Sequence, residues 1–318
     1  MTLHTVYITG CLGFMASRFV EKCLERGWKV FGVDRCTHVS NTDLIEVFGR
    51  APNFTFLRAD IRNIKHLPDC DYVVNFAAES HVGSSIIRSN DFMDSNVIGV
   101  KNLLDLVRDK PINTVNRPIF FHISTDEVYG DLESGHSTET DVLHPSNPYS
   151  ASKAAGDMLV MAWARTYDVQ YNVLRPTNNY GIRQYPEKLI PIAVKNLQRG
   201  KKIHLHDKGE PTRNWLHIDD TADAVLAIVD AGVTNEIYNV SGGFEQTNAE
   251  TVRKVIRAFF GTDENWKTHV SFEYCREGQD VRYALDDSKL RTLGWSPQKV
   301  FDEEIQGIVE HFKGNFRW

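Results

Sequence analysis

Short apolar runs alternate with longer segments of helical periodicity along the first half of the chain. The apolar runs predict buried strands at 5–9, 28–33, 54–60, 72–76, 118–123 and 170–174. Segments with an apolar stripe at helical spacing predict helices at 15–26, 91–110 and 149–167. Apolar strands that alternate with helices are typical of a parallel sheet with both faces covered. The pattern therefore predicts a doubly wound α/β domain.

The alternation of strands and helices breaks after Arg175. Prolines become frequent among short mixed segments, at positions 176, 186, 191 and 211, which is typical of less regular structure. A further strand and helix pattern near Trp215 favours a return of the chain to the first sheet. We therefore expect a large domain at 1–175 joined by 215–240, and a smaller α+β lobe at 176–214 and 241–318.

Composition restricts the partners and the setting of the protein. The 318 residues carry a formal net charge of −6, which favours neither nucleic acid nor an acidic membrane as a ligand. No run of about 18 apolar residues marks a membrane span, and the N-terminus lacks a basic-then-apolar signal. Five cysteines without a C-x-x-C pair predict a reduced, cytoplasmic setting. His204 and His206 have no further ligand nearby in the sequence, so no metal site is expected.

A glycine-rich turn joins the first strand to the first helix. It reads Gly10-Cys-Leu-Gly-Phe-Met-Ala16, and its small residues let the backbone approach a pyrophosphate at the helix N-terminus. Asp34 ends the second strand, where its carboxylate can accept the ribose hydroxyls of a dinucleotide. That carboxylate would repel the extra phosphate of NADP, although Arg35 beside it would partly offset the repulsion. The cofactor expected of this Rossmann-type domain is NAD.

Further contacts to the cofactor are expected around the same crevice. The complete expected set is Gly10, Gly13, Phe14, Met15, Asp34, Asp60, Ile61, Ala77, Tyr149 and Lys153. Asp60 ends the third predicted strand and would contact the adenine, and the alternative for this residue is a helix cap. A glycine-rich turn alone can be purely structural, so the inference rests on its register with the strand, the helix and Asp34.

Tyr149 and Lys153 are four residues apart on a predicted helix, so their side chains share one face. A neighbouring ammonium group stabilises a phenolate and would lower the pKa of Tyr149 from its usual value of about 10. Such a tyrosine can take the proton of an alcohol while hydride leaves the same carbon for NAD. Because this spacing is common on helices by chance, the inference also depends on the glycine-rich turn.

Two adjacent acids, Asp126 and Glu127, follow the strand at 118–123 and would lie at the same crevice. Alone they would indicate a solvated turn. Their segment, Ser124-Thr-Asp-Glu-Val-Tyr-Gly130, resembles the signature of the nucleotide-sugar 4,6-dehydratases of the dTDP-glucose 4,6-dehydratase type, in the extended short-chain dehydrogenase/reductase superfamily. The resemblance continues at 77–82, 178–181, 186–191 and 276–283.

The resemblance implies a division of catalytic roles. Tyr149, supported by Lys153, would take the proton of the sugar's C4 hydroxyl as C4 is oxidised. Glu127 would abstract the C5 hydrogen, and Asp126, kept protonated, would donate a proton to the departing C6 hydroxyl. Thr125 would hydrogen-bond the C4 oxygen. Return of the hydride to C6 and of a proton to C5 would then give a 4-keto-6-deoxy sugar.

The resemblance also implies which residues hold the nucleotide sugar. They are Ser80, Asn179, Glu187, Lys188, Arg213, Asn248, Arg276 and Gln279. Two sites depart from the family pattern: one loses a charge pair near the cofactor and the sugar, and the other changes a residue expected to recognise the base or ribose. Gly83-Ser84 stands where an Asp-Arg pair is usual, and Gln279 replaces a histidine. The motifs are compatible with both dTDP-glucose and UDP-glucose.

Three other functions share parts of this pattern. A UDP-sugar 4-epimerase would keep Tyr149 and Lys153 but would not require two acids. A UDP-glucuronate decarboxylase would share Glu127 but commonly has serine at position 126. Members that bind NAD only as sensors or scaffolds typically lose the tyrosine or the lysine, and this chain has both. Asp126 is therefore the residue that separates the dehydratase from its enzymatic rivals.

Apolar side chains on the helices at 91–110 and 149–167 leave two alternatives. These side chains are Leu103, Leu104, Leu106, Met158, Val160, Met161 and Trp163. The resemblance implies a homodimer in which these two helices form a four-helix bundle with their symmetry mates. The alternative is that the same side chains pack against the sheet.

Overall fold

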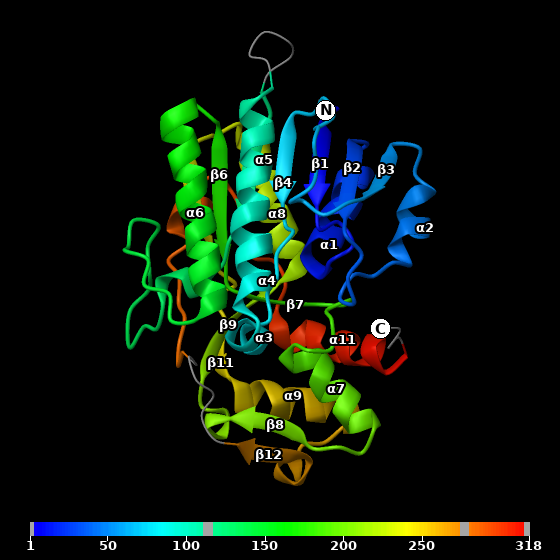
Figure 1. Ribbon diagram of the computed structural model, residues 1–318. Coiled ribbons are helices and arrows are strands. Elements are labelled where there is room, and N and C mark those ends of the chain that lie inside the picture. The colour runs from blue at the N-terminus through cyan, green and yellow to red at the C-terminus, as the bar shows by residue number, and fades with distance from the viewer. Residues whose placement is uncertain (1–2, 111–116, 274–279, 315–318) are drawn as a thin grey trace.

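A seven-stranded parallel sheet forms the centre of the larger part of the molecule (Figure 1). The computed structural model describes residues 3–110, 117–273 and 280–314. The strands are β1 (Thr5–Thr9), β2 (Lys29–Asp34), β3 (Phe54–Arg58), β4 (Tyr72–Asn75), β5 (Ile119–Ile123), β6 (Tyr171–Pro176) and β10 (Glu236–Val240). Their order across the sheet is β10–β6–β5–β4–β1–β2–β3, and every neighbouring pair is parallel. The predicted Rossmann-type sheet is confirmed.

Helices cover both faces of this sheet (Figure 1). They are α1 (Phe14–Glu25), α2 (Leu44–Gly49), α5 (Gly99–Arg108), α6 (Pro148–Tyr167) and α8 (Ile218–Ala231). Alternate residues of a strand point to opposite faces. Val6 and Ile8 accordingly lie in a core with residues of α1 and α8, whereas Tyr7 lies in a second core with residues of α5 and α6. The first strand thus anchors helices on both sides.

The helix predicted at 91–110 is not continuous. The chain forms α3 (Val82–Ile87), α4 (Ser89–Met93) and a π-helical turn, η1 (Asp94–Ile98), before α5. Within the turn, Asn96 is buried and its side-chain oxygen accepts a hydrogen bond from the Glu79 backbone N–H at 2.9 Å. The Asn96 amide group donates back to the Glu79 carbonyl, also at 2.9 Å. The π turn therefore fixes the loop that follows β4, as such turns often do at functional sites.

A smaller α+β part lies beyond the sheet's lower end in Figure 1. It contains β7 (Asn178–Tyr180), β9 (Thr212–His217) and β11 (Glu245–Thr247) in one sheet, and β8 (Ile203–His206) with β12 (Val270–Glu273) in another. Its helices are α7 (Leu189–Gln198), α9 (Asn248–Phe260) and α11 (Phe301–Gly314). Short elements are η2 (Asp126–Tyr129), η3 (Asp207–Gly209), η4 (Trp266–His269) and α10 (Ser288–Arg291). The predicted domain boundaries stay a prediction.

Three of the seven apolar side chains considered for a subunit interface are buried within the fold, and two more, Leu106 and Trp163, are partly buried against the same core. Leu103, Leu104 and Val160 are completely buried in the core between the sheet and the helices α5 and α6. Met158 is 49% exposed, and Met93 and Ile98 on the neighbouring helical segment are also exposed. The packing alternative therefore holds for Leu103, Leu104 and Val160, while Met158 is free to face a partner.

The described part of the chain contains no helix that combines the length and the apolarity needed to span a membrane. Among the same residues, no group of three or more His, Cys, Asp or Glu side chains is arranged to hold a metal ion. Cys11, Cys23, Cys36 and Cys70 are free thiols.

Candidate active site

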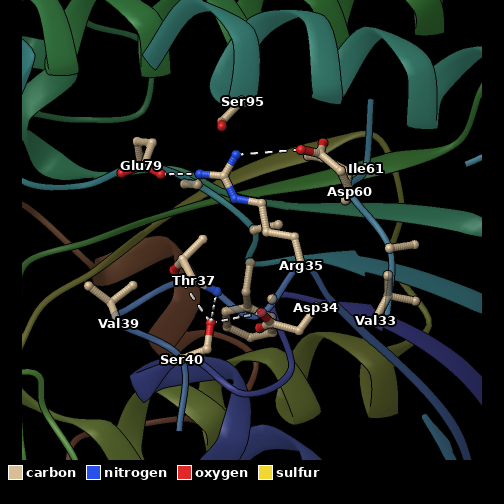
Figure 2. Close-up of a pocket in the computed structure, with 16 residues that line it drawn as sticks. Val33, Asp34, Arg35, Thr37, Val39, Ser40, Asp60, Ile61, Glu79 and Ser95 are labelled. Atoms are coloured by element: carbon tan, nitrogen blue, oxygen red, sulfur yellow. Dashed lines mark hydrogen bonds and ion pairs between the residues drawn. The ribbon is translucent and has the colours of Figure 1, made fainter. Parts of the chain in front are cut away.

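A cavity opens where β1, β2, β3 and β4 end (Figure 2). Gly10 has a φ of +67°, and a Cβ at this position would lie 2.9 Å from the backbone of Ala77, so only glycine fits. Gly13 is the N-cap residue of α1 and offers no side chain to the helix N–H groups, and no acidic residue lies in the first turn of the helix. The first N–H groups of the helix are thus available to an anion. These features fit the pyrophosphate of NAD.

Asp34 lines the cavity at the end of β2 and is buried. Its Oδ1 accepts hydrogen bonds from the Cys36 backbone N–H at 2.7 Å and from Ser40 Oγ at 2.8 Å. Its Oδ2 accepts one from the Leu12 backbone N–H at 3.1 Å. The carboxylate therefore fastens the glycine-rich turn to the loop after β2. The expected contact with a ribose hydroxyl stays a prediction, and Oδ2 is the oxygen with fewer hydrogen bonds in the structure.

The Arg35 side chain extends toward the opposite wall of the cavity, where it pairs with Glu79 (Figure 2). Its second guanidinium nitrogen lies 3.5 Å from Asp60. Burial raises the pKa of Glu79, and the charge of Arg35 opposes that rise. Sequence reasoning had noted Arg35 only as a neighbour of Asp34. The carboxylates that hold it come from loops distant in sequence, and no local pattern marks them.

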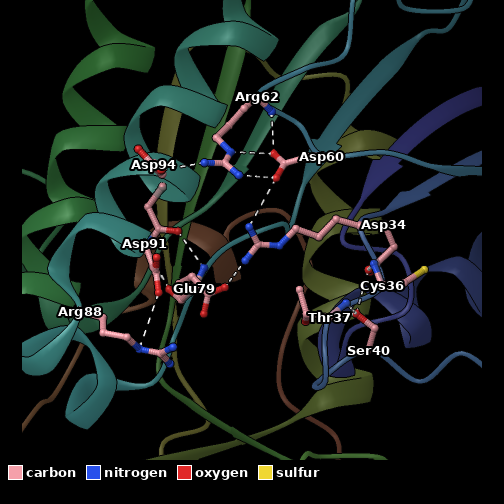
Figure 3. A network of polar contacts seen from close by, with 12 residues as sticks. Asp34, Cys36, Thr37, Ser40, Asp60, Arg62, Glu79, Arg88, Asp91 and Asp94 are labelled. Carbon is pink, nitrogen blue, oxygen red and sulfur yellow. Dashed lines mark hydrogen bonds and ion pairs between the residues drawn. The ribbon is translucent and has the colours of Figure 1, made fainter.

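Asp60 is shared between two arginines (Figure 3). Arg62 donates to both carboxylate oxygens of Asp60, at 3.1 and 2.8 Å, and to Asp94 at 2.7 Å. Burial alone would raise the pKa of Asp60, but the bonds from Arg62 outweigh burial and lower it. The Arg62 backbone N–H also donates to Asp60 at 2.9 Å, which makes Asp60 a cap for the turn that follows β3. The adenine contact expected of Asp60 stays a prediction.

The expected cofactor residues divide into two groups. Those that line the cavity are Gly10, Gly13, Asp34, Asp60, Ile61 and Ala77. The Phe14 side chain borders a different cavity, beside α11, and Met15 packs against the core. A contact from either residue to the cofactor would therefore use the backbone. Tyr149 and Lys153 stand on α6, apart from this lining.

A capping box fixes the start of α6, which carries Tyr149 in its first turn. Asn147 Oδ1 accepts a hydrogen bond from the Ser150 N–H at 3.0 Å, and the Asn147 N–H donates to Ser150 Oγ at 3.2 Å. Pro148 occupies the first turn, where its missing N–H costs nothing. Lys153 follows Tyr149 by one turn, and both side chains are buried.

The expected lowering of the Tyr149 pKa is wrong for this structure. Burial raises the pKa of Tyr149 above its usual value, and the negative charges of Glu127 and Asp126 raise it further. Lys153 Nζ instead donates a 2.6 Å hydrogen bond to the Ile123 carbonyl. Burial lowers the pKa of Lys153 to about 8. A lysine four residues away is thus not sufficient by itself to make this phenol acidic.

The acid pair lies on η2, directly after β5. Thr125 precedes the turn, and its Oγ1 accepts a hydrogen bond from the Glu127 N–H at 3.3 Å while donating to Asp126 Oδ1 at 3.2 Å. Asp126 Oδ2 is buried and has no hydrogen-bond partner among the described residues. Burial, and next the charge of Glu127, raise the pKa of Asp126 to about 8. Asp126 is therefore mostly protonated at neutral pH.

Glu127 has a different electrostatic environment. Burial raises its pKa as well, but the positive charges of Arg213 and Lys188 oppose that rise. The Asn147 side chain also favours the ionised form of Glu127. The two adjacent carboxyl groups thus differ in their surroundings, which is how proteins separate an acid from a base.

Comparison with known proteins identifies the family of this chain. The model of the family described as GDP-mannose 4,6 dehydratase matches residues 7–308. The chain belongs to the GDP-mannose 4,6 dehydratase family. The dTDP-glucose 4,6-dehydratase 1 of Escherichia coli K12 is 35% identical over 340 residues, which cover 98% of this chain and 94% of that protein. The low-salt glycan biosynthesis protein Agl12 of Haloferax volcanii is 36% identical over 315 residues, covering 98% and 99%.

A solved structure of the same type superimposes closely. The crystal structure of the dTDP-glucose 4,6-dehydratase from Streptomyces venezuelae, which contains NAD, matches with a TM-score of 0.91 and 35% identity. The match covers 98% of this chain and 97% of that one. The extended superfamily and the nucleotide-sugar dehydratase group expected from the motifs are confirmed.

In this member of the GDP-mannose 4,6 dehydratase family, two of the residues expected to hold the substrate place their positive charges where they act on Glu127. Lys188 Nζ donates a 2.8 Å hydrogen bond to the Ser80 carbonyl and lies 4.0 Å from the Glu187 carboxylate. Arg213 stacks over the ring of Tyr283 at 4.9 Å and donates to the Asp280 carbonyl at 3.0 Å. The structure thus brings two cations, Lys188 and Arg213, near the same acid.

Other expected substrate residues are less directly placed. Asn179 accepts a 2.5 Å hydrogen bond from Thr221 Oγ1 and donates one of 2.9 Å to the Thr177 carbonyl. Both atoms of its side-chain amide are therefore already bonded within the protein. Asn248 begins α9, and its backbone N–H donates to the Pro211 carbonyl at 2.9 Å. Arg276 and Gln279 lie outside the described residues.

The departure at Gly83-Ser84 has a local structural explanation. Both residues lie in the first turn of α3, which His81 caps. The Ser84 N–H donates to His81 Nδ1 at 3.1 Å, and Ser84 Oγ lies 2.8 Å from the same atom. A Cβ at position 83 would come within 3.2 Å of the His81 ring. The small residues therefore keep the His81 ring against the start of the helix.

Sequence reasoning missed a buried ion pair that joins α6 to β6. Asp157 Oδ2 accepts a 2.9 Å hydrogen bond from Arg175 Nε, and both side chains are almost fully buried. Arg175 also donates to the Tyr129 hydroxyl at 2.7 Å. His122 Nε2 lies 3.6 Å from Asp157 Oδ1, and burial holds the pKa of His122 well below its usual value. Asp157 follows Lys153 by one helical turn, and this spacing could have identified it.

Proposed function

We propose that the protein is an NAD-dependent nucleoside-diphosphate-glucose 4,6-dehydratase. It would convert dTDP-glucose to the 4-keto-6-deoxy sugar by C4 oxidation, elimination of water across C5 and C6, and return of a hydride to C6 and of a proton to C5. The observation that carries the proposal is the acid pair on η2, of which Asp126 is buried. Asp126 has a pKa of about 8 and an oxygen without a partner in the described protein, whereas Glu127 faces two cations.

The elimination needs an acid and a base at the same time. Glu127, in its ionised form, takes the hydrogen from C5, which the neighbouring C4 carbonyl acidifies. Asp126, in its protonated form, gives its proton to the leaving C6 hydroxyl, so that water departs. The unpartnered Oδ2 of Asp126 is an atom that the C6 hydroxyl can approach.

The oxidation at C4 involves Tyr149, which lies on α6. Tyr149 takes the C4 hydroxyl proton, and Thr125 orients the C4 oxygen. NAD, when bound in the cavity at Gly10 and Asp34, supplies the acceptor for the C4 hydride and its later donor. Because the protein's own groups raise the pKa of Tyr149, the phenol needs a positive charge close to it in the loaded site.

The choice of dTDP-glucose follows from the relatives. The Escherichia coli and Streptomyces venezuelae proteins are both named as dTDP-glucose 4,6-dehydratases. Lys188 and Arg213 supply the positive charge that a sugar diphosphate requires. A 4-epimerase reading would leave Asp126 without a role, because an epimerase has no hydroxyl to expel.

The test is incubation of the protein and NAD with dTDP-glucose and, separately, with UDP-glucose, followed by mass spectrometry. We expect loss of one water from dTDP-glucose. If neither sugar loses water under conditions where a known dehydratase acts, the proposal is wrong. If UDP-glucose reacts faster, the reaction stands and the nucleotide is reassigned.

The Asp126→Asn variant separates the two half-reactions. Asparagine keeps a hydrogen-bond donor but cannot give up a proton, so water loss should slow by about 10²-fold, the lower end for a lost general acid. C4 oxidation should persist and appear as transient NADH absorbance. Equal loss of oxidation and elimination would contradict the roles assigned to Asp126 and Tyr149.

Two further parts of the proposal concern assembly and setting. Met158 on α6 and Met93 and Ile98 beside α5 present exposed apolar surface on neighbouring helices, which supports a homodimer through a four-helix bundle. The mass measured by light scattering tests this directly. A nucleotide-sugar substrate and free thiols support a cytoplasmic setting.

A further inference from the structure

The charged residues that line the cofactor cavity are mainly acidic. Its described lining contains three carboxylates, Asp34, Asp60 and Glu79, and Arg35 is the one basic residue among them. A dinucleotide with a 2′-phosphate would bring close to two further negative charges into this cavity. Cavities that accept NADP use an arginine near the end of the second strand for that phosphate. Arg35 stands at that position.

Arg35 is nevertheless engaged by two carboxylates. One guanidinium nitrogen pairs with Glu79, on the loop after β4, and another lies 3.5 Å from Asp60, on the loop after β3. Figure 2 shows the guanidinium held between these two side chains. Asn96 in the π turn fixes the backbone of Glu79 through two hydrogen bonds of 2.9 Å. The position of the Glu79 carboxylate therefore depends on structure far from Asp34.

We propose that Glu79, with Asp60, excludes NADP by neutralising Arg35, so that Glu79 determines cofactor specificity together with Asp34. The carboxylate of Asp34 repels a 2′-phosphate, but alone it leaves Arg35 free to attract one. The pairing with Glu79 removes this compensating attraction. The proposal rests on the placement of the cofactor in this cavity, as given under Proposed function.

The experiment measures dissociation constants of NAD and NADP by calorimetry on protein freed of bound cofactor. Glu79→Gln keeps the shape of the side chain and removes its charge. We expect NADP to bind about tenfold more tightly to this variant, because Arg35 gains a free charge for the phosphate. Binding of NAD should change by less than about threefold, because NAD has no group that uses this charge.

Asp94→Asn is the matched control. It removes one negative charge from the same network (Figure 3), but Asp94 pairs with Arg62 and does not line the cavity. NADP affinity should stay within about twofold of the parent protein. An equal gain in Asp94→Asn and Glu79→Gln would overturn the proposal, because the effect would then come from net charge alone.

The role of Arg35 is tested by a second substitution. In the double variant Arg35→Leu/Glu79→Gln the gain in NADP affinity should disappear, and a gain that persists would overturn the proposal. Asp60→Asn should shift NADP affinity in the same direction as Glu79→Gln, so the test stands even if one variant fails to fold. No gain in either variant would also overturn it.

Failure of the cofactor placement gives a different result. Gly10→Val places a side chain against the Ala77 backbone and should abolish binding of both dinucleotides. If Gly10→Val still binds NAD, the placement under Proposed function is wrong. If Gly10→Val no longer binds NAD, and Glu79→Gln leaves NADP binding unchanged, then the cofactor placement stands and only the specificity role of Glu79 is wrong.

Discussion

Two ion pairs in this molecule use the same chemical groups in opposite surroundings. Arg175 on β6 and Asp157 on α6 pair at 2.9 Å with side chains that are 2% and 0% exposed. Arg35 and Glu79 pair at the rim of the cofactor cavity with side chains that are 33% and 28% exposed. When a pair is broken, water solvates the charge left at the rim but cannot reach the buried one. The buried pair therefore supports the fold, and the rim pair sets the charge offered to a ligand.

The largest expected effect comes from breaking the buried pair. Asp157→Asn leaves the Arg175 guanidinium without a counter-charge in the core between β6 and α6. We expect the free energy of unfolding to fall by about 3–5 kcal/mol, measured by urea denaturation. Lys153 should also lose part of its charged form, because Asp157 is the group that favours it.

The double variant Asp157→Leu/Arg175→Met is the control for this prediction. Replacing both charges by apolar side chains removes the uncompensated charge, so much of the stability should return. If Asp157→Asn costs less than about 1 kcal/mol, the pair behaves like an exposed one, and the contrast between core and rim is incorrect.

Asp126 sharpens the contrast, because it is a buried carboxyl group held by a hydroxyl rather than by an ion pair. Its pKa is raised to about 8, so the proton-donating form is present at neutral pH and is lost as pH rises through about 8. We expect the rate of water loss to fall about tenfold per pH unit above that value. Single-turnover measurements of water loss between pH 6 and pH 10, a range of roughly two units either side of the pKa, test this.

Lys153 titrates in the same range, since burial lowers its pKa to about 8. The Lys153→Arg variant keeps a positive charge throughout that range, so any fall in water loss that persists belongs to Asp126. A fall centred near the usual pKa of aspartate, about 4, would mean that Asp126 is solvated and ionised at neutral pH.

The strands of the sheet could be predicted from the sequence because each is marked by the residues of the strand itself. β1 occupies the residues expected of it, 5–9, since an uninterrupted apolar run flanked by polar residues has few alternatives. The turn at Gly10 and the end of β2 at Asp34 follow the same logic. These features depend on neighbours in sequence, and local pattern therefore identifies them.

The features that sequence reasoning missed depend on distant contacts. The bond from Arg35 to Glu79 joins residues 44 positions apart, and no local spacing predicts it. The π turn within 91–110 exists because Asn96 bonds to the Glu79 backbone across the fold. The pKa of Tyr149 was predicted from one nearby lysine, whereas burial and two carboxylates decide it.

The smallest expected effect comes from the rim pair. Arg35→Leu removes a guanidinium that is one-third exposed, and water can solvate the two carboxylates left behind. The free energy of unfolding should fall by no more than about 1 kcal/mol. Arg50→Leu, which breaks the exposed pair of Arg50 with Glu46 on the surface near α2, is the matched comparison and should cost a similar amount. A loss of several kcal/mol in Arg35→Leu alone would show that the rim pair also supports the fold. Glu79 would then contribute to the stability of the fold as well as to cofactor specificity.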